Sequence, residues 1–194
     1  MNNTKGEALW TAEFLGMSLS NFLIYITQYA MIAALPIVIM TEYGGGDVEA
    51  GLAMTFFQIG TVVARPFVGR IFDRKGSDYT VYPGLVLFAA GTFLLGDIEG
   101  LTGLIAAALL LGAGFGAVTP ALQTLAVRSA PPARAGVATA TYFWSLDISV
   151  GLAAAGLGIV AVTYGYAFTY SIVDVAVIAA GALCYAVWRR SQHT

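Results

Sequence analysis

The sequence has one cysteine, one histidine and few charged residues among its 194 positions. The single cysteine, Cys184, excludes a disulfide framework and a thiolate zinc site, and the single histidine, His193, excludes a site built from several imidazoles. The formal net charge is −2, and no basic patch alternates with aromatic residues, which excludes nucleic-acid binding. No nucleophile–base pair, metal cluster or phosphate loop is present, so we expect no enzyme and no cofactor.

Apolar residues take the place of the missing charge. They make up 58% of the chain against 10% charged residues, and the mean hydropathy is +0.79. Soluble domains have about 45–50% apolar residues and about 25% charged residues, so the outer surface of this protein must face lipid. A run of roughly 20 apolar residues crosses a hydrocarbon core of about 30 Å. Six such segments fill residues 1–194 as a single bundle: 14–40, 50–72, 80–96, 101–127, 134–162 and 165–188.

The basic residues gather at one set of segment ends. They are Lys5, Arg65, Arg70, Arg74, Lys75, Arg128, Arg134, Arg189 and Arg190, and the alternate connections have none. The positive-inside rule therefore places both termini and the even-numbered loops in the cytoplasm. Residues 1–13 lack the pattern of a cleaved signal, so we expect the first segment to remain as a span.

An internal repeat relates the two halves of the chain. The sequence AGLA at 50–53 opens the second segment, and AGVA at 135–138 opens the fifth, an offset of 85 residues. The same offset carries the first segment onto the fourth and the third onto the sixth. Because three crossings separate the copies, they enter the membrane from opposite sides, as in the inverted repeats of many secondary transporters.

The connection after the second segment has a recognisable motif. Residues 69–76 read GRIFDRKG, with Gly69, Asp73, Arg74 and Gly76 at the fixed positions of Gly-x-x-x-Asp-Arg-x-Gly. In this loop of a six-segment bundle, the motif resembles the signature of the major facilitator superfamily. Members of that family usually have twelve helices in two halves. Residues 9–14 are similar to the first half of bacterial drug-efflux members, whereas 71–84 and 130–151 resemble a second half, and Ser77-Asp78 replace the basic residues usual in a first half.

The resemblance implies a fold and a function. The fold is an all-α integral membrane bundle of six transmembrane helices in a 3+3 inverted repeat, half of a major facilitator fold, in the bacterial inner membrane. Two copies would form a homodimer that works by alternating access around a cavity lined by the first and fourth helices. The efflux members imply export of a small, partly apolar solute in exchange for protons. An uncoupled facilitator and a non-transporting, engineered or ancestral half-transporter are the alternatives.

The resemblance also gives the motif a role as a gate. In the family, its acidic residue caps the start of a helix in the opposite half, where the helix dipole favours a carboxylate. Asp73 of one copy would then approach residues 134–136 of the other. The alternative interpretation is that residues 73–75 form a solvated charged loop.

Two carboxylates fall inside predicted spans, where a charge costs about 2.5–3.5 kcal/mol and therefore indicates a function. Asp147 lies near the middle of the fifth segment, on a stripe of mostly small residues at helical spacing that predicts a helix–helix contact. It is a candidate proton carrier or a permanently hydrogen-bonded carboxyl. Asp174 in the sixth segment is a second candidate for proton coupling, with a structural role favoured by the peripheral place of that helix in the family.

Hydrogen-bonding side chains line one face of the first segment: Ser18, Asn21, Tyr25 and Gln28, at spacings of three and four. Lipid cannot satisfy them, so they must face the bundle interior or a watery cavity. Thr119 and Gln123 in the fourth segment and Gln58 in the second are further candidates for contact with the solute. The glycines at 112, 114 and 116 predict close helix packing and are not a nucleotide fingerprint.

Overall fold

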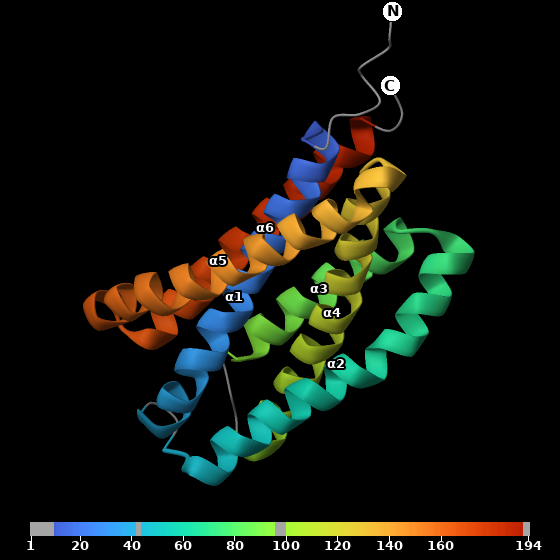
Figure 1. Ribbon diagram of the computed structural model, residues 1–194. Helices are drawn as coiled ribbons and strands as arrows, with labels where there is room; N and C mark the ends of the chain where they lie inside the picture. The colour runs from blue at the N-terminus through green and yellow to red at the C-terminus, as the bar shows by residue number, and fades with distance from the viewer. Residues whose placement is uncertain (1–9, 42–43, 96–99, 192–194) are drawn as a thin grey trace, which may run out of the picture.

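The computed structural model describes residues 10–41, 44–95 and 100–191, which are helical apart from short turns (Figure 1). The long helices are α1 (Ala12–Thr41), α2 (Asp47–Lys75), α3 (Asp78–Leu95), α4 (Gly100–Arg128), α5 (Ala135–Tyr164) and α6 (Tyr166–Ser191), with a 3-10 turn, η2 (Pro132–Arg134), before α5. The side chains at 30–31, 33–34, 38, 41, 154–162, 166–173, 188 and 191 lie outside the description. The predicted all-helical fold is confirmed, and the predicted segments differ from the helix bounds by at most three residues, as at 50–72.

Three of these helices, α2, α3 and α4, are long and apolar enough to cross a membrane by length and composition. Within α6 a shorter apolar stretch covers Asp174–Val187. This result concerns the described residues only. The crossing of the membrane by all six helices therefore stays a prediction.

The ends of the helices follow local chemistry. At the start of α2, the backbone N–H of Gly46 donates to the Glu49 carboxylate at 2.8 Å, which satisfies a donor left free at the helix start. At its end, the N–H of Gly76 donates to the carbonyl of Phe72 at 3.0 Å. Gly76 has φ +94°, a left-handed conformation that glycine adopts without steric cost. The motif glycine thus ends α2 and turns the chain toward α3.

Alternate glycines of α4 fit it closely against two different helices. A Cβ on Gly112 or Gly116 would collide with the backbone of α2 at Phe57 and Thr61, and one on Gly114 would collide with α3 at Phe88. The hydroxyl of Thr61 donates to the carbonyl of Gly112 at 3.1 Å, which ties α2 to α4. The prediction that these glycines serve packing is confirmed, since they let the helix backbones touch.

The helices form two groups (Figure 1). In one group α4 packs against α2 and α3, and in the other α1 packs against α5 and α6. Contacts of α1 with α4, and fewer contacts of α3 with α6, join the groups. The helices α1 and α4 therefore hold the centre of the bundle.

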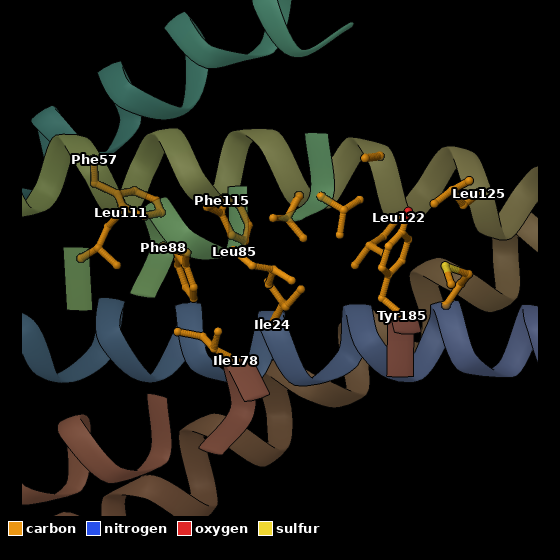
Figure 2. Close-up of a cluster of buried hydrophobic side chains, with 14 of the residues drawn as sticks. Ile24, Phe57, Leu85, Phe88, Leu111, Phe115, Leu122, Leu125, Ile178 and Tyr185 are labelled. Atoms are coloured by element: carbon orange, nitrogen blue, oxygen red, sulfur yellow. The ribbon is translucent and has the colours of Figure 1, made fainter. Parts of the chain in front are cut away.

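An aromatic residue of α4 lies at the centre of the core. The ring of Phe115 meets Tyr25 of α1 edge-on at 5.3 Å between centroids, Phe57 of α2 at 5.8 Å and Phe88 of α3 at 6.5 Å. Figure 2 shows Phe115 among the side chains of these helices, with Ile24 of α1 below. Such ring pairs contribute about 0.5–1.5 kcal/mol each beyond burial, so Phe115 fixes four helices relative to one another.

A polar cluster ties the start of α3 to the end of α6. The hydroxyl of Tyr185 lies 2.6 Å from Oδ1 of Asp78 and 2.9 Å from Oγ of Ser77. The other carboxylate oxygen of Asp78 pairs with Arg189 at 3.0 Å. The two residues that depart from the usual first-half motif, Ser77 and Asp78, thus make an interhelical contact here.

Candidate functional site

A cavity of about 540 Å³ opens between α1, α2 and α4, near the end of the bundle where α2 and α4 finish. It brings together predicted solute residues of two helices and predicted gate residues of a third. The lining residues are Tyr25, Arg65, Val68, Gly69, Phe72, Asp73, Thr119, Pro120, Ala121, Gln123, Thr124 and Arg128. The cavity is therefore the structure's candidate site.

The cavity begins where the close packing of α2 on α4 ends. The backbones touch at Gly112 and Gly116. One to three turns further along α4 the same side carries Pro120, Thr124 and Arg128. These larger side chains keep α2 away from α4, because no small residue allows the backbones to meet there. The glycine pattern of α4 therefore sets the depth of the cavity.

Hydroxyl groups on the α4 wall are already used in hydrogen bonds. Thr119 donates to the carbonyl of Phe115 at 2.9 Å, and Thr124 donates to that of Pro120 at 2.8 Å. Behind this wall, the buried Tyr142 of α5 donates to the carbonyl of Thr119 at 3.3 Å. The polar wall is thus rigid, and the side chain of Gln123 forms no hydrogen bond with another described residue.

Two arginines in the cavity were not predicted as site residues. Arg65 lies on α2 and Arg128 at the last position of α4, where its guanidinium carbon is 5.4 Å from the centroid of the Phe72 ring. From the sequence alone, both arginines are interpreted only as markers of orientation in the membrane. Arg65 carried a signal, however, because it falls seven residues inside the predicted span 50–72.

The polar face of α1 points into the bundle, as expected, but only part of it reaches the cavity. Tyr25 lines the cavity, whereas Ser18, Asn21 and Gln28 are buried. Both side-chain polar atoms of Asn21, Oγ of Ser18 and Oε1 of Gln28 have no hydrogen-bond partner among the described residues. These groups are candidates for contact with water or solute in another state of the bundle.

Gln58 lies apart from the cavity. It is exposed on the outer side of α2, in a shallow groove with Met54, Thr55, Ile59, Val62 and Val63. The structure therefore separates it from the other candidate solute residues.

The motif residues divide between the cavity and the surface. Gly69 and Asp73 line the cavity, Arg74 is exposed, and Gly76 ends α2. Among the described residues, none forms an ion pair with Asp73. Its carboxylate is exposed at the rim and is available to a partner outside the bundle.

The two candidate carboxylates for proton coupling lie in opposite environments. Asp147 is exposed on α5, together with Gly136, Ala140, Phe143 and Gly151 of the same stripe. The helix–helix contact predicted for this stripe is therefore not made among the described residues of the bundle. Asp174 of α6 is 2% exposed, and its Oδ1 has no hydrogen-bond partner in the described part of the chain.

Curated relatives are transport proteins from bacteria. The chain is 30% identical over 122 residues to the uncharacterized transporter YebQ of Escherichia coli, covering 59% of this chain and 26% of the relative. It is 28% identical over 136 residues to the multidrug export protein EmrB of Haemophilus influenzae, covering 70% of this chain and 26% of the relative. The matches thus span about a quarter of the length of these relatives.

Solved structures share the fold. A variant of the peptide transporter POT in complex with alafosfalin superposes with a TM-score of 0.77 at 20% identity, covering 91% of this chain and 38% of the other. Tetrameric PepTSo2 superposes with a TM-score of 0.76 at 18% identity, covering 93% and 41%. At this identity the likeness concerns the fold alone.

A bundle of long helices, three of them apolar enough to cross a membrane, with a cavity lined partly by polar residues, is typical of the class of membrane proteins that includes transporters. Residues 17–194 match the Major Facilitator Superfamily, and the chain belongs to this family. The resemblance seen in the motif is confirmed. Family and fold point to a transporter rather than an enzyme.

Proposed function

We propose that this chain is one half of a secondary transporter, which pairs with a second copy and works by alternating access in the bacterial inner membrane. Each copy is a single bundle of six transmembrane helices with both termini in the cytoplasm. The chain covers 26–41% of the relatives and neighbours described above. In the proposed dimer, the second copy takes the place that the other half of such a protein has.

The helix contacts support a 3+3 inverted repeat. Replacing each helix by the one three places along the chain exchanges α2 with α5, α3 with α6 and α4 with α1. This exchange turns the group in which α4 packs on α2 and α3 into the group in which α1 packs on α5 and α6. The 85-residue offset in the sequence predicts the same correspondence.

The exposed faces of α2 and α5 are the observation that carries the proposal. On α3 and α6 the large exposed side chains in the middle of each helix, such as Val86 and Leu183, are apolar and suit lipid. On α2 and α5 the exposed residues include Gln58, Arg65 and Asp147, beside small residues and large apolar ones such as Val62 and Ile148. Charged side chains within spans face protein or water rather than lipid, and small residues mark helix contacts. We therefore assign these two faces to a second copy.

Cysteine cross-linking between copies tests the pairing. Val62 lies 13 residues before Lys75 at the end of α2, and Ile148 lies 13 residues after Ala135 at the start of α5. At 1.5 Å per residue, both are about 20 Å from the end of the bundle that has the basic residues. With Cys184 replaced by alanine, Val62→Cys and Ile148→Cys are expected to form a covalent dimer in membranes.

The matched control places the cysteines on the helices assigned to lipid. Val86→Cys on α3 and Leu183→Cys on α6 are at positions at least as exposed as Val62 and Ile148, and we expect no dimer from them. A dimer from this control pair but not from α2 and α5, or no dimer from either pair, would contradict the paired architecture. A non-transporting half that stays a monomer would be the remaining interpretation.

Export of a small, partly apolar solute in exchange for protons is the proposed activity. The relation to the multidrug export protein EmrB supports efflux. Tyr25, Thr119 and Gln123 are proposed to contact the solute in the cavity, with Asn21, Gln28 and Gln58 as residues that only another state would bring to it. Asp147 is proposed to carry the proton, because pairing would bury it between α5 and the partner's α2. An uncoupled facilitator would need no such group.

A further inference from the structure

Arg65 is a positive charge within a predicted span that has no ion-pair partner among the described residues. It lies ten residues before Lys75, about 15 Å along α2 at the rise of an α-helix. Proteins keep a guanidinium at such depth where it meets water or an opposite charge. Asp73 lines the same cavity, but no ion pair joins it to Arg65. Arg65 is exposed to the cavity, so its charge is open to a ligand of opposite charge.

Arg128 adds a second guanidinium to the same cavity. It lies near the ring of Phe72, 5.4 Å from guanidinium carbon to ring centroid, a cation–π contact that favours this position of the charged group. No carboxylate of the described chain pairs with it. The lining therefore has two positive charges and one negative charge, Asp73.

Donors exceed acceptors in the cavity. Each guanidinium has five N–H donors and no acceptor, and the amide of Gln123 adds two further donors. The hydroxyls of Thr119 and Thr124 already donate to backbone carbonyls. A ligand that fits this lining must bring acceptor atoms with negative charge, which is the chemistry of a carboxylate or a phosphoryl group.

The rest of the lining is apolar. Val68, Phe72, Pro120 and Ala121 form one part of the wall, and the ring of Tyr25 forms another. About 540 Å³ is the size of a pocket for a small organic molecule. A ligand with an anionic group and an apolar body would contact both the arginines and the apolar part of the lining.

We propose that the cavity binds a small organic anion, whose carboxylate or phosphoryl group is held by Arg65 and Arg128 and whose apolar part lies against Phe72 and Tyr25. This inference names the substrate class of the proposed transporter and rests on that function only in taking the bound anion to be the transported solute.

Binding of a matched pair of probes to the full chain in nanodiscs tests the proposal. Benzoate and benzamide have nearly the same shape and differ in charge, and phenylphosphonate tests the phosphoryl alternative. We expect benzoate or phenylphosphonate to bind at millimolar or lower concentration, and benzamide to bind at least about tenfold more weakly, because charge-assisted hydrogen bonds are lost.

Variants then locate the site. Arg65→Gln and Arg128→Gln are each expected to weaken binding of the anion by about ten- to a hundredfold, with little change for benzamide. Arg70→Gln is the control, since Arg70 is an exposed arginine of α2 outside the cavity lining. Arg65→Lys keeps the charge without the planar fork, so an intermediate affinity is expected, and it replaces Arg65→Gln if that variant does not fold.

Three results would overturn the proposal: equal affinities for benzoate and benzamide, equal effects of Arg65→Gln and Arg70→Gln, or no binding of either anion at millimolar concentration. Cross-linking at positions 62 and 148 is measured without ligand. A failure of the paired transporter is therefore distinguishable from a failure of the anion site.

Discussion

At the scale of single residues, glycines set the distance between helices. Gly112 has the backbone of α2 directly against its Cα, whereas Gly51 has no atom within 4 Å of where a Cβ would lie. We expect Gly112→Ala to lower the free energy of unfolding by about 1–3 kcal/mol, because the methyl group forces the helices apart. Gly51→Ala should raise it by up to about 1 kcal/mol through helix propensity.

Reversible unfolding in mixed detergent measures both changes. The two substitutions are chemically the same and both fall within helices, so propensity acts equally on them. Effects of the same sign and size would show that the contact at Gly112 is looser than described.

Asp147 is the residue on which proton coupling is proposed to depend. We expect Asp147→Asn to abolish uptake driven by a pH gradient in vesicles while exchange of solute down its own gradient continues, because an amide cannot take up and release a proton. Asp174→Asn is the comparison, since Asp174 is buried on α6 among the packed helices. Coupling that survives in Asp147→Asn and is lost in Asp174→Asn would transfer the role to Asp174.

Some site residues could be predicted from the sequence and others could not. Tyr25, Thr119 and Gln123 line one cavity. This could be predicted because a polar side chain inside an apolar span is unfavourable in lipid and therefore faces the bundle interior or a cavity. Gln58 is equally polar, yet it lies on the outer side of α2. Helical spacing tells which residues share a face but not which way that face points. Arg65 was missed because a basic residue near a loop already had an explanation as a marker of orientation.

At the scale of helices, the bounds were predictable because hydropathy and the placement of basic residues both follow from the lipid environment. The packing partners of each helix were less predictable. The small-residue stripe of α5 predicts a close contact, but the described helices leave that stripe exposed. Small residues indicate that another helix packs closely against them, but they do not indicate whether that helix belongs to the same bundle.

The end of α2 is proposed to act as a gate through Asp73. The exposed start of α5, at 134–136, has the positive end of a helix dipole. A carboxylate there contributes about 0.3–1 kcal/mol, so Asp73→Asn should shift the open and closed populations about two- to fivefold. Labelling of a cysteine at Gln123, inside the cavity, by an impermeant maleimide from the cytoplasmic side should become faster by that factor.

Asp73→Glu is the control for the gate, because it keeps the charge and changes only the length of the side chain. Equal labelling rates in Asp73→Asn and Asp73→Glu would contradict a role of the charge and favour the interpretation of a solvated loop.

At the scale of the whole molecule, the surface of the bundle has two characters. Among the described residues, the outer sides of α3 and α6 are apolar, whereas α2 and α5 expose charged, amide and small residues beside large apolar ones. The cavity of one bundle lies at its side, between α1, α2 and α4. A second body against α2 and α5 would turn that side cavity into an enclosed one, which is why the oligomeric state decides the mechanism.

The link between Tyr185, Asp78 and Arg189 has a mechanical consequence. It clamps α3 to α6 at one end of the bundle, while the α1–α4 contact holds the middle. Because the two groups of helices are joined by contacts at two levels of the bundle, neither group can rotate without the other. Each bundle should thus move as a rigid body. Any movement that transports a solute would then have to occur at the interface between two bundles.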